Sequence, residues 1–336
     1  MHHGKGVRPP GDRLELAFPA PPEGRTLLVG APADLPSGRF DSARSVAVQT
    51  DAAAHAALMR RGFAVETAVP EGHFDGAVVF LPRARAAARA RIAAAAATLA
   101  PRAELWVDGQ KTDGVEAMLR ELRGLGPVGE ILTRAHGKLF AVTVPEGDWL
   151  PADWAAVTRE VAPGFVTRPG VFSADGPDPG SMLLAAALPP RMPSRVVDLG
   201  AGWGWLAAQV LAREGVTELH LVESDHDALA CARENIRDPR ARFHWADATG
   251  FRLPEPVNGV VMNPPFHEGR AATPRLGAAF IAAAAGMLTQ AGRLWMVANR
   301  HLPYEAELGR HFARVEEFGG DSRYKLLTAT GAKRRR

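Results

Sequence analysis

An acid followed by three glycines forms a motif whose residue types and spacing are suited to binding a ligand. Asp198 lies in an apolar run, and three glycines follow at alternate positions, namely Gly200, Gly202 and Gly204. Residues 195–199 are typical of a buried strand, and residues 205–213 carry apolar side chains at helical spacing. Glycine lets a ligand approach the backbone where a Cβ atom would collide. Because ligands in open α/β sheets bind at the carboxyl ends of strands, the loop predicts a pocket.

A second carboxylate, Glu223, ends the next predicted strand. An acid about 20 residues after such glycines typically meets ribose hydroxyls, so the ligand is predicted to carry a nucleoside. The glycine spacing differs from the G-x-G-x-x-G pattern of dinucleotide sites, and Asp198 would repel a phosphate but attract a cation. S-adenosylmethionine, which carries an ammonium and a sulfonium, fits these residues better.

The motif Asn263-Pro264-Pro265-Phe266 indicates which reaction takes place. Here the chain resembles the class I methyltransferases that methylate amino groups conjugated to a π-system, whose delocalised lone pair makes them poor nucleophiles. The side-chain oxygen of Asn263 and the carbonyl oxygen of Pro264 can each accept one amino hydrogen, which favours a pyramidal nitrogen. Proline fixes φ and therefore holds that carbonyl rigidly. Phe266 is expected to stack on a base extruded from its helix or loop.

Length and composition indicate a globular protein of two domains. The chain has 336 residues, of which 46% are hydrophobic and 23% charged, and its net charge is +3. We expect no membrane partner, because no apolar run reaches the length of a membrane span. We expect no metal site, because no cluster of cysteines and histidines is present. A single cysteine, Cys231, and the absence of a hydrophobic signal region predict a cytoplasmic location.

The first half of the chain alternates strand-like and helix-like segments and repeats the second half. Strands are expected at 26–30, 45–48, 77–81, 104–107 and 139–144. Four segments match the second half in the same order: 45–51 with 219–225, 74–82 with 257–265, 104–106 with 293–295, and 137–140 with 324–327. This internal repetition predicts a duplicated domain.

The first copy lacks the residues that predict a ligand in the second. No glycine loop follows Gly30, Gln49 stands where the second copy has Glu223, and Phe80-Leu-Pro replaces Asn-Pro-Pro. We therefore expect a degenerate copy that binds no cofactor and serves as a scaffold. A helix predicted at 83–100 carries four arginines and no acid among them: Arg83, Arg85, Arg89 and Arg91. These arginines are candidates for RNA contacts, and a solvated helix face is the alternative.

The predicted domains are a degenerate copy at 1–150, a linker and cofactor-covering segment at 151–193, and a catalytic domain at 194–336. The middle segment is rich in proline and glycine, with a short helix predicted at 154–161. A second helix is expected after Asp178 or Ser181, ending at Pro189, and its N-terminus could close over the cofactor. The catalytic domain is expected to hold a seven-stranded, mostly parallel sheet whose last strand is antiparallel.

Three stretches together resemble the RsmC family of bacterial methyltransferases, which modify guanine N2 of small-subunit (16S) rRNA. They are Gly170-Val-Phe-Ser173, Asn263-Pro-Pro-Phe-His267 and Val297-Ala-Asn-Arg-His-Leu-Pro-Tyr304. The resemblance implies an α/β chain with two tandem Rossmann-like methyltransferase domains, of which only the C-terminal one binds S-adenosylmethionine. It also implies rRNA or the small ribosomal subunit as the partner.

The resemblance assigns roles to individual residues. It implies that S-adenosylmethionine is held by Asp198, Gly200, Gly202, Gly204, Glu223 and Asp247. Asp247 would meet the adenine amino group. The guanine would be held by Asn263, Pro264 and Phe266, and the substrate mouth would be lined by His267, Asn299 and Tyr304. We expect His267 to position the substrate rather than to act as a base, because the amino proton becomes acidic once the nitrogen is alkylated.

Two other functions fit parts of the sequence. A protein glutamine N5-methyltransferase can use the same Asn-Pro-Pro-aromatic motif, but it usually carries tyrosine where this chain has Phe266, and it would not explain a duplicated domain. A non-catalytic RNA-binding or ribosome-assembly factor is the other alternative, against which the intact Asn263 and Glu223 argue. A dehydrogenase is disfavoured by the glycine spacing.

Overall fold

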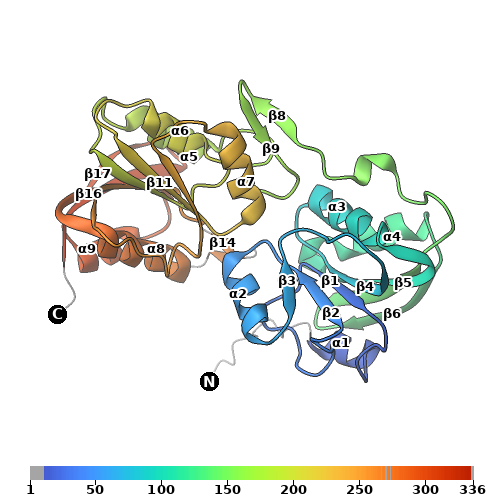
Figure 1. Cartoon of the computed structure of the whole chain (residues 1–336). Helices are drawn as coiled ribbons and strands as arrows, with labels where there is room; N and C mark the ends of the chain where they lie inside the picture. The colour runs from blue at the N-terminus through green and yellow to red at the C-terminus, as the bar shows by residue number, and fades with distance from the viewer. Residues whose placement is uncertain (1–10, 266, 269–270, 273, 334–336) are drawn as a thin grey trace, which may run out of the picture. The chain divides into compact units, whose positions relative to one another are not determined.

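The computed structural model describes residues 11–265, 267–268, 271–272 and 274–333. The chain divides into two compact units, residues 1–157 and residues 158–336, which we call the first and second domains. The division falls inside the segment 151–193. Figure 1 shows that each domain is built on a twisted sheet with helices packed against it.

The sheet of the first domain has seven strands, of which only β7 runs antiparallel to its neighbours. In spatial order the strands are β3 (Ala64–Glu66), β2 (Ser45–Val48), β1 (Thr26–Val29), β4 (Phe74–Phe80), β5 (Leu99–Gln110), β7 (Gly137–Thr143) and β6 (Val128–Arg134). The central strand β1 is buried along its whole length because both faces of the sheet are covered.

Helices bury the two faces of this first sheet in separate apolar clusters. One face is covered by α3 (Arg85–Ala96) and α4 (Val115–Arg123), and the other by α1 (Gly11–Ala17) and α2 (Ala52–Arg60). Two short 3₁₀ turns complete the domain, η1 (Lys111–Asp113) and η2 (Ala152–Trp154). The fully buried Arg13 of α1 pairs with Asp108 of β5 at 2.8 Å, which fixes the first helix to the sheet.

The second domain repeats this sheet, again with one antiparallel strand, β18. In spatial order its strands are β12 (Ala241–Trp245), β11 (Glu218–Glu223), β10 (Arg195–Leu199), β13 (Val257–Met262), β16 (Leu288–Asn299), β18 (Tyr324–Ala332) and β17 (Phe312–Gly320). The predicted seven-stranded, mostly parallel sheet with an antiparallel last strand is confirmed.

Five helices and two small strand pairs surround the second sheet. One face packs against α5 (Pro179–Ala187), α6 (Trp205–Leu211) and α7 (His226–Asn235), and the other against α8 (Pro274–Met287) and α9 (Tyr304–His311). The two antiparallel pairs are β8 (Arg159–Ala162) with β9 (Phe165–Thr167), and β14 (His267–Glu268) with β15 (Ala271–Ala272). This arrangement leaves the carboxyl ends of β10, β11 and β13 together at one edge.

The two sheets share the same strand order and register, as expected for a duplicated domain. Thr26 pairs with Ser45 and Gly76, while Val196 pairs with Leu219 and Gly259, as the sequence matches predict. Gly30 is therefore the counterpart of Gly200, Gln49 of Glu223 and Phe80 of Asn263.

The helix predicted at 154–161 is wrong. Residues 152–154 form a single 3₁₀ turn, and the residues from Arg159 belong to β8, which pairs with β9. Pro151 and Pro163 bound a segment too short for an independent helix, and the β-branched Val157 and Thr158 favour an extended chain.

Two of the arginines of α3 pair with an acid on the neighbouring helix α4. Glu121 of α4 accepts from Arg85 and from Arg89, each at 2.8 Å. Arg89 also lies over the Trp154 ring at 5.3 Å. Arg91 donates to the carbonyl oxygen of Phe80 at 3.0 Å. Arg85 and Arg89 therefore join α3 to α4 through Glu121, and Arg91 joins α3 to β4 through the Phe80 carbonyl.

Candidate functional site

A pocket in the second domain brings together residues from three separate stretches of the chain. It is lined by Phe172, Ser173, Asp178, Ser181, Asp198, Gly200, Ala201, Gly202, Trp203, Trp205, Leu206 and Asn263. The glycine loop joins β10 to α6, and Asn263 directly follows β13. Because β10 and β13 are adjacent and parallel, their carboxyl ends place the acid and the asparagine around the same space.

Asp198 presents a carboxylate to this pocket. The residue is 1% exposed, and no side chain in the described part of the chain donates to either carboxyl oxygen. Burial raises the pKa of the Asp198 carboxyl to about 8, the negative charge of Glu223 contributes to the rise, and the backbone N–H of Ala207 partly offsets it. A buried acid without a side-chain partner is costly, so this position is suited to a cationic ligand that would compensate its charge.

The glycines of the loop differ in what they make possible. All three have positive φ, of 82° at Gly200, 55° at Gly202 and 89° at Gly204. A Cβ atom on Gly202 would meet nothing within 4 Å, so this residue borders open space, whereas one on Gly204 would lie 2.9 Å from Ile236 of the segment after α7. Gly202 therefore leaves room for a ligand, and Gly204 allows α6 and α7 to approach.

Glu223 lies at the end of β11 and orders the glycine loop. Its carboxylate accepts from the Gly202 backbone N–H at 2.7 Å and from the Asp225 N–H at 2.9 Å. Burial raises the pKa of Glu223, and these two N–H groups partly offset that rise. Its counterpart Gln49 also accepts from a backbone N–H two residues on, at 2.9 Å, but it donates to the Ala31 carbonyl instead of accepting from the loop. The acidic site is thus specific to the second domain.

Asn263 is anchored from the opposite wall by α5. Its side-chain nitrogen donates to Asp178 Oδ1 at 2.7 Å and to Ser181 Oγ at 2.9 Å. Asp178 is also the N-cap of α5 and accepts from the Ser181 N–H at 2.9 Å. The predicted cap and the end of this helix before Pro189 are confirmed. The contacts with Asn263 were not predicted.

The segment before α5 is fastened to the glycine loop. The Trp203 indole donates to the carbonyl oxygen of Phe172 at 3.0 Å, and its ring packs edge-on against Phe165. Asn235 of α7 donates to the Trp203 carbonyl at 2.9 Å and to the Val166 carbonyl at 3.0 Å. Trp203 is 3% exposed and packs between these elements. Phe172 and Ser173, at the end of this segment, therefore form part of the pocket wall.

Several predicted site residues lie away from this pocket. Asp247 is exposed beyond β12, where its carboxylate accepts from the backbone N–H and hydroxyl of Thr249. Asn299 is half-buried at the end of β16 and pairs with Tyr324. Tyr304 is 2% exposed and packs against Gly277 of α8, so the structure places it in the core rather than at a substrate mouth. No local sequence pattern around Tyr304 predicts that this side chain is buried.

The residues after Asn263 are described only in part. Pro264 is buried and Pro265 exposed, while Phe266 lies outside the described residues. The backbone of His267 belongs to β14. Among the residues that the structure describes, no group of three or more His, Cys, Asp or Glu side chains could hold a metal ion. No helix in the same part of the chain is both long and apolar enough to cross a membrane.

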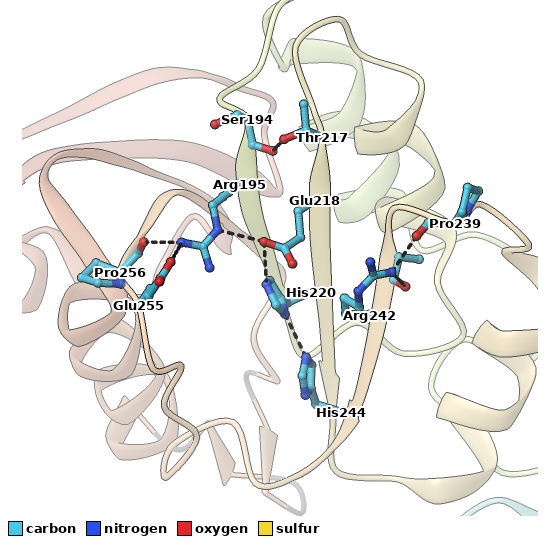
Figure 2. A network of polar contacts seen from close by, with 11 residues as sticks. Ser194, Arg195, Thr217, Glu218, His220, Pro239, Arg242, His244, Glu255 and Pro256 are labelled. Carbon is cyan, nitrogen blue, oxygen red and sulfur yellow. Dashed lines mark hydrogen bonds and ion pairs between the residues drawn. The ribbon is translucent and has the colours of Figure 1, made fainter.

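A second polar network begins at the amino-terminal ends of β10 and β11 and reaches His244 near the carboxyl end of β12 (Figure 2). Arg195 of β10 donates to Glu218 of β11 at 2.8 Å and to Glu255 at 2.9 Å. His220 lies 3.5 Å from Glu218, and its Nδ1 is 2.9 Å from Nε2 of His244 on β12. Burial lowers the pKa of both histidines. None of these residues lines the pocket.

Comparison with known proteins gives the same division into two halves. The methyltransferase small domain family model matches residues 163–328, and the model of the N-terminal methyltransferase small domain matches residues 22–146. Ribosomal RNA small subunit methyltransferase C of Shewanella pealeana is 30% identical over 264 residues, covering 76% of this chain and 77% of the relative. The same enzyme of Stutzerimonas stutzeri is 30% identical over 318 residues, covering 91% and 94%.

Among solved structures, the chain is similar to the T. thermophilus 16S rRNA N2-guanine methyltransferase RsmC in complex with AdoMet and guanosine. The TM-score is 0.80 at 29% sequence identity, with 98% of this chain and 93% of that chain covered. The similarity thus extends over both domains.

Proposed function

The chain belongs to the family of ribosomal RNA small subunit methyltransferase C, and we propose that it methylates guanine N2 in 16S rRNA, with S-adenosylmethionine as donor. The observation that carries this proposal is that Asp198 and the anchored side chain of Asn263 line the same pocket of the second domain. The similar T. thermophilus enzyme was solved with AdoMet and guanosine, which represent the two ligands expected here. RNA binding and a cytoplasmic location are part of the same proposal.

The cofactor would be held mainly by the carboxyl ends of β10 and β11. When bound, S-adenosylmethionine supplies an electrophilic methyl group. Asp198 would compensate its positive charge, and Gly202 leaves open space beside the loop. Glu223 has lone pairs beyond those that its two N–H donors use, so it can accept from ribose hydroxyls. Asp247 at the end of the next strand is the proposed partner of the adenine amino group.

The substrate amine would be oriented by oxygens that follow β13. The side-chain oxygen of Asn263 and the carbonyl oxygen of Pro264 accept the two hydrogens of the guanine amino group. This draws the nitrogen out of conjugation and directs its lone pair at the methyl group. After transfer the nitrogen is acidic and its extra proton passes to water, so no strong base is required. Phe266, His267 and Asn299 remain proposed contacts of the base and its neighbours.

The first domain would act as a scaffold and contribute to RNA binding. Its sheet has the same order as the catalytic one, but Gln49 and Phe80 replace the residues that would meet cofactor and amine. We propose the domain boundaries predicted above, with residues 158–193 contributing the pocket wall of the catalytic part.

The test is transfer of labelled methyl groups from S-adenosylmethionine to small ribosomal subunits that lack the modification, followed by nucleoside analysis. We expect N2-methylguanosine, and we expect Asn263→Ala to lower kcat about 100-fold or more while cofactor binding persists. The matched control is Asn258→Ala, because Asn258 is exposed on the same strand. Label in protein glutamine would instead support the alternative enzyme, and RNA binding without label would support a non-catalytic factor.

A further inference from the structure

Asn263, Asp178 and Ser181 form a hydrogen-bonded cluster that joins the end of β13 to the start of α5. Asp178 Oδ1 accepts from Asn263 Nδ2 at 2.7 Å and from the Ser181 N–H at 2.9 Å, and Ser181 Oγ lies 2.9 Å from Asn263 Nδ2. We propose that Asp178 and Ser181 are positioning residues that fix the orientation of the Asn263 carboxamide. The proposal rests on the function proposed above, in which the oxygen of that carboxamide meets the substrate.

The chemistry of the cluster allows only one orientation of the amide. An ionised carboxylate can only accept hydrogen bonds, so the group of Asn263 that faces Asp178 must be the NH2. A rotation of the amide by half a turn would place its oxygen against the carboxylate and remove a charge-assisted bond. Because the carboxamide is planar, fixing the nitrogen toward α5 leaves the oxygen as the group directed elsewhere.

This orientation matters because the substrate amine is itself a donor. An Asn263 side chain that presented its NH2 to the guanine amino group would oppose two donors and could not draw the nitrogen out of conjugation. Acceptors that are already oriented need no rearrangement during the reaction, which is where fixed dipoles are most effective in catalysis. The carboxylate of Asp178 thus acts on the substrate through Asn263 and does not need to touch it.

The backbone holds Asp178 in turn. Its φ and ψ of −66° and 132° are those of an N-cap, and Pro179 occupies the first helical position. A Cβ atom on Gly180 would lie 3.1 Å from Asp178 Oδ1 and 3.2 Å from the ring of Tyr324 on β18. The first turn of α5 is therefore packed closely, and the carboxylate has little freedom to move away from Asn263.

Two substitutions at Asp178 separate the orienting role from helix capping. Serine caps helices well but is too short to cap α5 and reach Asn263 together, whereas asparagine keeps the cap and an acceptor oxygen. We expect Asp178→Ser to lower kcat about 10- to 100-fold with little change in the KM for S-adenosylmethionine, and Asp178→Asn to restore most of the loss. The matched control is Asp51→Ser, because Asp51 caps α2 in the first domain through Ala54 at 2.9 Å. That control should leave kcat unchanged.

A second measurement, by NMR, observes the side-chain amide of Asn263 directly and does not depend on enzyme activity. The sequence has four asparagines, at positions 235, 258, 263 and 299, so selective ¹⁵N labelling of asparagine gives four side-chain NH2 pairs. Comparison with Asn263→Ala identifies the pair of Asn263. We expect Asp178→Ser and Ser181→Ala, but not Asp51→Ser, to move this pair and to speed its hydrogen exchange.

The two measurements distinguish failure of this proposal from failure of the proposed function. If wild-type protein methylated no RNA, the proposed function would fail, and the amide resonances would still report whether Asp178 orients Asn263. If Asp178→Ser left both kcat and the Asn263 pair as they are in Asp51→Ser, the positioning role would be overturned. A loss of kcat that asparagine did not restore, with an unmoved amide pair, would overturn it as well.

Discussion

Arg91 of the first domain lies beside Gly30 as Phe280 of the second domain lies beside Gly200. Leu99 and Leu288 occupy equivalent positions in the two sheets, since they pair with the equivalent residues Phe74 and Val257. Arg91 precedes Leu99 by as many residues as Phe280 precedes Leu288, so Arg91 and Phe280 are counterparts. A guanidinium therefore stands in the first domain where the second has an apolar ring. The sequence there also lacks an acid at the position of Asp198, since Leu28 is its counterpart. A cationic cofactor would meet this guanidinium in the first domain and would find no carboxylate at the position of Asp198.

We predict that each chain binds one molecule of S-adenosylmethionine, in the second domain. Calorimetric titration should give a stoichiometry of one, and Asp198→Asn should weaken this binding at least about tenfold, because a charged hydrogen-bonding or ionic partner contributes about 1.4 kcal/mol or more. Arg91→Ala should leave stoichiometry and affinity unchanged. Two sites per chain, or a second site created in Arg91→Ala, would contradict the account of the first domain.

The same Asp198 should make the ligand-free protein less stable as pH rises. Its pKa is about 8 in the folded chain against an ordinary value of 3.8, so the folded state binds more protons between these values. The free energy of unfolding should therefore fall from about pH 4 to about pH 8, and Asp198→Asn should remove this loss, by a few kcal/mol at pH 9. Urea denaturation at pH 5, 7 and 9 measures it. Asp175→Asn is the control, because the Asp175 side chain is 94% exposed, and an equal gain there would count against the prediction.

Gly204→Ala should destabilise the second domain through packing as well as backbone strain. The residue has φ of 89°, and an added Cβ atom would lie 2.9 Å from the Ile236 side chain and 3.2 Å from Ala232. Gly38 has φ of 73° with nothing within 4 Å, so Gly38→Ala isolates the strain. We expect a loss of about 1 kcal/mol at Gly38 and about 2–4 kcal/mol at Gly204 in denaturant unfolding. If both variants lost the same free energy of unfolding, the prediction that Gly204 packs closely against Ala232 and Ile236 would be wrong.

His220 and His244 should make stability depend on pH below neutrality. Burial lowers the pKa of both from 6.5, so the unfolded chain binds more protons between the lowered values and 6.5. Stability should be complete above about pH 6.5 and should fall as the pH drops through this window, because the folded state resists protonation of both groups. His220→Leu should flatten this fall between pH 7.5 and 5.5. His301→Leu, at an exposed histidine, should keep the wild-type slope; a flattened slope in that variant would refute the assignment.

The sequence by itself determined the repeated strands and the three chemical positions at Asp198, Glu223 and Asn263. These features depend on local patterns, since an apolar run, a glycine loop and a proline pair each require only neighbouring residues. The duplication could also be read, because the matching segments fall on the same strands in both sheets. The helix predicted at 154–161 is wrong because residues from Arg159 onward pair with β9, a contact that a helical pattern does not reveal.

Only the tertiary structure decided which residues surround those positions. Asp178 and Asn263 are 85 residues apart in sequence and meet because α5 packs beside the end of β13. The burial of Tyr304 and the pairing of Glu121 with the arginines of α3 have the same origin. The sequence shows that residue 198 is an acid. Its raised pKa comes from burial away from solvent and from the charge of Glu223 on the neighbouring strand, which only the fold produces. Burial and long-range hydrogen bonds arise only when distant segments pack together, so no local pattern can specify them.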